Sequence, residues 1–209
     1  QALPDLAEKQ KGCENCTTCN ERIDFFDLLT EEEVEIVNRD RYSVRFREEE
    51  LIIKQGVTAT HIISLTSGIA KVYVEGTHNR NLLLRLVTPW IIVDEPGVYT
   101  DKKNQFSIAA LTPCKVCFID AKNFNEVLSR NSRFACEVIN HRSRHSMFCL
   151  DRMVSLTQKQ MLGRMADGLL YLSRSIYKSS EFELNLSRQD LADLTSMSKD
   201  SAIRMLKEL

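Results

Sequence analysis

Short runs of β-branched and aromatic residues occupy the middle of the chain. They are YSVRF, LIIK, HIISL, GIAKVYV, NLLLRLV, FSIAALT and KVCFI, within residues 42–119. Turn residues such as Gly56, Gly68, Gly76 and Pro113 separate them. Several short strands at roughly regular spacing are typical of an antiparallel sandwich or barrel.

Helical patterns flank this region on both sides. Residues 23–38 place apolar side chains among acids, and Thr30 with Glu33 forms the T-x-x-E pattern of a capping box. After Asp120 the strand pattern stops, and residues 124–155 contain no Gly or Pro. We expect a short helical entry before the strands and one long helix after them.

Apolar positions along the long helix predict a second copy of the chain as its partner. Spacings of three, four or seven relate Phe134, Val138, His145 and Phe148, and an adjoining stripe holds Ile139, Cys149 and Met153. This is more apolar surface than one sheet can cover, so a helix from another subunit is the natural cover. The alternative is an amphipathic helix packed on its own domain.

The C-terminal segment predicts two short helices joined by a tight turn. A helix is expected over residues 158–176, and residues 187–209 then read SRQDLADLTSMSKDSAIRMLKEL. Ser187 and Ser198 are suitable N-caps for two further helices. Such a helix-turn-helix can place its second helix in the DNA major groove, which is about 12 Å wide. Plain packing of a helical hairpin is the competing interpretation.

Composition excludes some classes of protein and leaves others open. The chain has 209 residues, 43% of them hydrophobic, with a net charge of −1 that gives no sign of nucleic-acid binding. No apolar run resembles a membrane span or a signal peptide, so we expect a soluble, cytoplasmic protein. Four scattered histidines, without a nucleophile elbow or phosphate loop, argue against an enzyme.

Three of the seven cysteines form a C-x2-C-x2-C run at Cys13, Cys16 and Cys19. Two-residue spacers let three thiolates converge on one metal centre, as in runs that bind a [4Fe-4S] cluster. Zinc is also chemically reasonable for these thiolates. Free thiols without a cofactor are the third alternative.

The order of these elements resembles the CRP/FNR family of transcription regulators over essentially the whole chain. The resemblance rests on HIISLTSGIAKVYVEG, KVCFIDAKNF, LTQKQMLGRMADGLLYL and SRQDLADLTSMSKDSAIRMLKEL. It implies an α+β protein with a cyclic-nucleotide-binding-type β-roll (a jelly roll), a dimerisation helix and a winged helix whose wing is absent from this chain. The implied domains are a cysteine-containing tail (1–22), the β-roll (23–130), the dimerisation helix and hinge (131–156) and a truncated DNA-binding domain (157–209).

The resemblance also implies functional residues and partners. A homodimer would bind a palindromic operator and contact RNA polymerase. Arg188 would hold a phosphate, Asp200 would accept from a cytosine amino group, and Arg204 would pair with guanine. Ser196 replaces a common turn glycine, at little cost if φ there is negative. The implied DNA-binding set is Arg188, Ser198, Lys199, Asp200, Ser201, Ile203, Arg204 and Lys207, and the implied dimer set is Phe134, Val138, Ile139, His145, Phe148 and Met153.

Two further expectations concern the signal. Relatives that bind cyclic AMP hold its phosphate with an Arg-Ser pair, and Asn104 and Gln105 stand there in this chain, so cyclic AMP is not expected as a ligand. In the oxygen-sensing branch, a cysteine of the last β-roll strand completes the cluster site, and Cys117 aligns with it, with Cys114 as a close alternative. The alternative to DNA binding is a β-roll that binds ligands or partners beside a non-functional helix-turn-helix.

Overall fold

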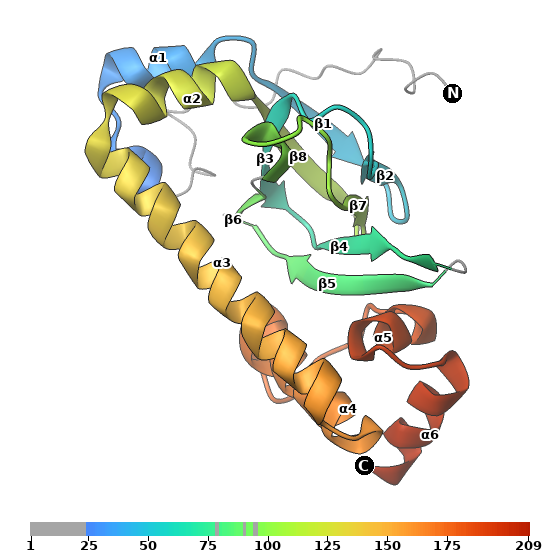
Figure 1. Cartoon of the computed structure of the whole chain (residues 1–209). Coiled ribbons are helices and arrows are strands. Elements are labelled where there is room, and N and C mark those ends of the chain that lie inside the picture. The colour runs from blue at the N-terminus through green and yellow to red at the C-terminus, as the bar shows by residue number, and fades with distance from the viewer. Residues whose placement is uncertain (1–23, 78–79, 90, 94–95) are drawn as a thin grey trace.

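A computed structural model describes residues 24–77, 80–89, 91–93 and 96–209 of the chain. A β-roll and three flanking helices form one part, and a long helix leads from it to a group of short helices at the other end (Figure 1). None of the described helices is long and apolar enough to span a bilayer.

The β-roll consists of two four-stranded antiparallel sheets. One sheet has the order β1 (Tyr42–Phe46), β8 (Cys114–Asp120), β3 (His61–Ser67) and β6 (Ile91–Val93). The other has the order β2 (Leu51–Ile53), β7 (Ser107–Ala110), β4 (Ala70–Glu75) and β5 (Asn81–Val87). All seven expected strands are present. The strand β6 was not predicted, because its three residues lie between two prolines, show no periodicity and pair only with β3.

Helical segments begin and close the β-roll. The 3-10 helix η1 (Asp24–Leu28) precedes α1 (Glu31–Asn38), which starts at the expected capping box of Thr30 and Glu33. A 3-10 turn, η3 (Pro96–Val98), follows β6. Helix α2 (Ala121–Arg130) follows β8 directly, with the Asp120 carboxylate capping its first amides.

The long helix expected from residue 124 is two helices, α2 and α3 (Ser132–Gln158). Asn131 separates them with a non-helical φ of −112° and ψ of 97°. Its side-chain amide donates to the Leu28 carbonyl at 3.0 Å and to the Glu33 carboxylate at 2.9 Å, while its oxygen accepts from the Phe134 amide. The local bond to the Phe134 amide makes Asn131 a cap, and the bonds to Leu28 and Glu33, which are distant in sequence, hold it outside a helix interior.

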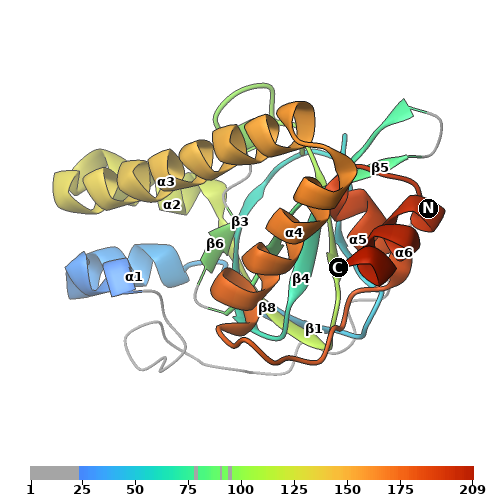
Figure 2. The same ribbon diagram turned by 90° about the horizontal axis from the view of Figure 1, so that it is seen from below.

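The C-terminal helices pack together against the lower sheet of the β-roll. Helix α4 (Met161–Tyr171) continues into a π-helical turn, η4 (Leu172–Tyr177), and is followed by α5 (Arg188–Thr195) and α6 (Lys199–Glu208). Viewed from below, α4 and α5 lie over the sheet that contains β4 and β5 (Figure 2). One hydrophobic cluster joins Leu83, Leu86 and Leu111 of the β-roll to Leu191 and Leu194 of α5.

Candidate nucleic-acid interface

Local hydrogen bonds fix the start of α5. Ser187 and Asp190 form a capping box in which the Asp190 carboxylate accepts from the Ser187 hydroxyl at 2.6 Å and from its backbone amide at 3.2 Å. In return, the Asp190 backbone amide donates a hydrogen bond to the Ser187 hydroxyl oxygen. Arg188, the first residue of the helix, is exposed. Its guanidinium is therefore accessible to a phosphate.

The turn between α5 and α6 requires a left-handed residue. Ser196 has φ 50° and ψ 53°, and the Met197 amide donates to the Ala192 carbonyl at 3.0 Å. The condition under which serine would replace glycine at little cost, a negative φ, is therefore not met at Ser196. A serine at positive φ carries a steric cost that glycine avoids.

Ser198 begins α6 as its N-cap. Its hydroxyl accepts from the Ser201 amide at 3.2 Å and contacts the Ser201 hydroxyl at 2.9 Å. These two hydroxyls, both assigned to DNA contact by the resemblance, thus have a capping role in the free chain.

Helix α6 has a buried side and an exposed side. Ala202 and Met205 are buried against the other helices. Lys199, Asp200, Arg204 and Lys207 are exposed, whereas Ser201 and Ile203 are half-buried. The exposed residues recur at helical spacing, so the structure brings these four together along one open side of α6.

Two arginines that the sequence analysis missed support the end of α5. Arg152 of α3 donates to the Leu194 carbonyl, and Arg164 of α4 donates to the Ser196 carbonyl at 2.9 Å. These carbonyls have no partner within the helix, so the guanidiniums satisfy them. Sequence alone gave no signal for these contacts, because 42 and 32 residues separate the partners.

A close approach between α4 and α5 depends on Gly168. A Cβ placed there would lie 3.0 Å from the Thr195 methyl carbon. Thr195 itself is fully buried, and its hydroxyl donates to the Leu191 carbonyl at 2.7 Å. A larger residue at position 168 would push the two helices apart.

The structure corrects part of the expected dimer face. Phe134 is fully buried within its own chain, with its ring 5.6 Å from Phe25 and 5.5 Å from Phe124 between centroids. Val138 belongs to the same interior cluster. These two residues face the β-roll, because η1 and α2 enclose the first turns of α3, and they are unavailable to a second subunit.

The other expected dimer residues divide between two sides of α3. His145 and Phe148 are half-buried, and the Phe148 ring lies 5.3 Å from the Tyr171 ring of α4. Ile139 and Met153 are exposed. A longer exposed row at spacings of three and four contains Cys136, Ile139, Ser143, Met147, Leu150 and Val154. We refer to these six residues as the α3 row.

The positions expected for a phosphate ligand hold amides in the β-roll. Asn104 is buried, and its side-chain amide donates to the Lys54 carbonyl at 3.3 Å. Gln105 is exposed and donates to the Asp101 carboxylate at 2.9 Å. Neither side chain carries the positive charge that a cyclic phosphate would need there.

The expected metal ligands are only partly described. Cys13, Cys16 and Cys19 lie outside the described residues. Cys117 is buried on β8, where its sulfur accepts a hydrogen bond from the Arg41 guanidinium at 3.2 Å. Among the residues that the structure describes, no group of three or more His, Cys, Asp or Glu side chains could hold a metal ion.

Comparison with known proteins agrees with this architecture. Residues 43–131 match the family model of the cyclic nucleotide-binding domain. No curated protein matches the sequence.

Three solved structures share the fold at low sequence identity. FixK2 from Bradyrhizobium japonicum is 16% identical, with 81% of this chain and 84% of that one covered at a TM-score of 0.72. The c-di-GMP-responsive global regulator CLP from Xanthomonas campestris is 19% identical, with 86% and 91% covered at a TM-score of 0.72. A CRP/FNR-family regulator from Eubacterium rectale is 13% identical, with 88% and 85% covered at a TM-score of 0.75.

These matches confirm the resemblance on which the sequence analysis relied. Residues 43–131 of the β-roll match the cyclic nucleotide-binding domain, and the chain as a whole has the fold of a solved CRP/FNR-family regulator.

Proposed function

We propose that this protein is a dimeric transcription regulator that reads a palindromic DNA operator with helix α6. The observation that carries the proposal is the open side of α6, where Lys199, Asp200 and Arg204 are exposed on a helix that begins directly after a tight turn. A helix presented in this way fits the major groove. Two solved structures that share the fold, CLP and the Eubacterium rectale protein, are described as regulators, which supports the same conclusion.

Each side chain has a chemical role in this proposal. Arg204 pairs with a guanine through two donors, and Asp200 accepts from a cytosine amino group. Asp200 is shorter than the glutamate usual in the family, so its reach toward the base is smaller. Arg188, Lys199 and Lys207 contact phosphates, which sets the position of the helix without reading sequence. Ile203 is half-buried and contacts a thymine methyl group.

The α3 row is the proposed dimer contact. Met147 is 66% exposed and Leu150 is 60% exposed in the single chain. Spacings of three and four are those of residues that meet across a pair of coiled helices. A second copy would bury this row and place two α6 helices on successive turns of one DNA face, about 34 Å apart.

The test is binding to a palindromic duplex over a range of salt concentrations. We expect Arg204→Ala to cost about 1 to 3 kcal/mol on a matched operator and little on a scrambled duplex. Arg188→Ala should weaken both duplexes alike and make the salt dependence shallower. Arg174→Ala, which removes an exposed arginine from η4, serves as the control.

Equal losses on both duplexes for Arg204→Ala would contradict its role in reading bases. If the wild-type protein shows no salt-dependent binding to any duplex, the β-roll acts as a ligand-binding or interaction module instead. These outcomes separate the two functions that the sequence leaves open.

We propose further that the regulator does not respond to cyclic AMP. The amides of Asn104 and Gln105 support this, because a phosphate in the β-roll would lack its cationic partner there. Isothermal titration with cyclic AMP should show no binding, and a saturable signal that strengthens DNA binding would contradict the proposal.

The cysteine run supports a metal centre as the signal input. Cys13, Cys16 and Cys19 would supply three thiolates for a [4Fe-4S] cluster, and Cys117 is the proposed fourth ligand. Purification without oxygen, followed by iron and zinc analysis and visible absorption, tests this. Absorption that air bleaches indicates a cluster, and stoichiometric zinc without colour indicates a zinc site. If neither signal is found, the cysteines are free thiols.

A further inference from the structure

The first helix of the proposed DNA-binding unit is docked on the β-roll. Helix α5 lies directly beneath β5 (Figure 1), and Leu191 and Leu194 pack in one cluster with Leu83 and Leu86. The Tyr171 hydroxyl of α4 adds a polar contact, since it accepts from the Leu86 amide at 2.9 Å. The two parts of the chain therefore share one interior.

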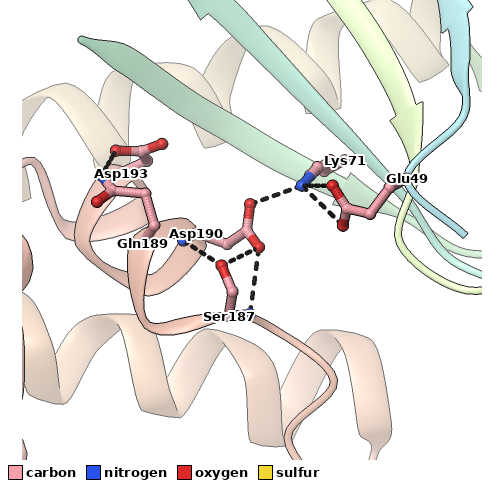
Figure 3. Close-up of polar contacts among 6 residues, drawn as sticks. All are labelled: Glu49, Lys71, Ser187, Gln189, Asp190 and Asp193. Atoms are coloured by element: carbon pink, nitrogen blue, oxygen red, sulfur yellow. Dashed lines mark hydrogen bonds and ion pairs between the residues drawn. The ribbon is translucent and has the colours of Figure 1, made fainter.

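A buried ion pair crosses the same boundary. Lys71 of β4 lies 2.8 Å from Asp190 of α5, measured from Nζ to Oδ1, and the side chains are only 12% and 11% exposed. On its other side Lys71 lies 3.2 Å from the exposed Glu49 carboxylate. Figure 3 shows the ammonium between the two carboxylates. By contrast, the Lys54–Glu75 pair joins the residue after β2 to the end of β4, and its side chains are 50% and 33% exposed.

Asp190 uses its two oxygens for different parts of the molecule. One oxygen accepts from Ser187 in the capping box, and the other accepts from Lys71 (Figure 3). The Asp190 carboxylate thus connects the first turn of α5 to β4, and both of its oxygens are held by hydrogen bonds. Although burial alone would favour the neutral amine, hydrogen bonds and the charges of Asp190 and Glu49 raise the pKa of Lys71, so the ion pair persists at neutral pH.

The docking leaves the proposed reading side open. Asp190 and Leu191 face the β-roll, whereas Arg188 at the start of α5 and Lys199, Asp200 and Arg204 on α6 are exposed. DNA can therefore approach α6 while the ion pair is intact. The contact therefore leaves this side of α6 uncovered.

We infer that Lys71 and Asp190 form a latch that presets the angle of α6 on the β-roll, so that both subunits of a dimer meet their half-sites together. The inference rests on the proposed DNA-binding function. Binding of two linked sites benefits from geometry fixed in advance, whereas a single half-site can be met by one subunit at any angle. Lys71 and Asp190 are thus positioning residues without DNA contact of their own.

The test combines hydrogen exchange with two duplexes. In Lys71→Met, the backbone amides of α5 and of Leu86 should exchange faster. This measurement, made on the protein without DNA, detects the undocking of α5 from the β-roll. Affinity for the full palindrome should fall at least about tenfold, with affinity for a half-site duplex unchanged within about twofold. Lys71→Arg, which keeps the charge, should restore both the exchange protection and the palindrome affinity.

Matched variants separate the latch from general damage. Lys54→Met removes a lysine ion pair inside the β-roll and should change neither readout. Ser187→Ala weakens the cap but keeps the ion pair, whereas Asp190→Asn removes the charge. Asp190→Asn should therefore reproduce Lys71→Met, including its loss of palindrome affinity, and Ser187→Ala should retain docking.

Unchanged exchange in both Lys71→Met and Asp190→Asn would overturn the latch. Faster exchange with equal losses on palindrome and half-site would overturn its role in alignment. If the wild-type protein binds neither duplex, the proposed function fails and the alignment role fails with it, while the exchange data still decide whether the ion pair holds α5 on the β-roll.

Discussion

The surface of α3 divides lengthwise into two halves, on opposite sides of the helix, that are similarly apolar but have opposite surroundings. In the enclosed half, Phe134 and Val138 are covered by η1, α1 and α2. In the exposed half, which carries the α3 row, Met147 and Leu150 are mostly open to solvent, although they are equally apolar. The difference shows that an apolar stripe on a helix marks a partner surface only where the chain itself leaves it uncovered.

The largest expected effect is in the enclosed half. Phe134→Ala should lower the free energy of unfolding by about 3 to 5 kcal/mol, because it opens a cavity between three aromatic rings. Chemical denaturation measures this. Ile139→Ala is the control, and at protein concentrations below dimer formation it should change stability by less than about 0.5 kcal/mol. A similar small change in Phe134→Ala would remove the distinction between the two halves.

The exposed half should respond in assembly and not in monomer stability. Leu150→Glu places like charges opposite each other in a symmetric interface, so the dimer dissociation constant should rise at least about tenfold. Sedimentation equilibrium measures it. Arg144→Glu, an exposed residue outside the α3 row, should leave the dimer unchanged. A Leu150→Glu protein that stays dimeric would show that α3 does not form the interface.

His145 is half-buried on the enclosed half of α3 and should make stability depend on pH. Burial first, and then the charges of Arg85, His141 and Arg142, lower its pKa from 6.5 to about 4. The unfolded chain therefore binds this proton more readily, and stability should fall as the pH drops from 6.5 toward 4. Denaturation at several pH values checks this. His145→Asn should show a shallower decline over that range, and an identical decline would assign the effect to other groups.

The smallest effect is expected beyond the far end of α3, at the turn before α6. Ser196→Gly relieves a positive φ and should raise the free energy of unfolding by about 0.5 kcal/mol, after the greater freedom of glycine in the unfolded chain is subtracted. Thermal unfolding can detect this. Ser198→Gly, at a negative φ, should instead lower stability slightly through the lost cap.

Local chemistry explains what could be predicted of the fold. The short β-branched run HIISL predicted β3, and the T-x-x-E pattern predicted the start of α1, because both depend on residues close in sequence. The same holds for Ser187 and Ser198 as N-caps. Helical spacing alone also predicted which side of α6 is exposed.

Other features depended on partners far away in the sequence. Asn131 ends α2 with the help of Leu28, which lies 103 residues earlier. Arg152 and Arg164 support α5 over long separations, and β6 exists only because β3 is beside it. No local pattern encodes such contacts.

The sequence by itself determined seven of the eight described strands, the caps at Thr30, Ser187 and Ser198, the turn before α6 and the residues that α6 can present. The tertiary structure alone decided which half of α3 is covered and that Lys71 meets Asp190 across 119 residues. The physical reason is that periodicity specifies which side of an element is apolar, whereas burial and ion pairing depend on what the folded chain brings against that side.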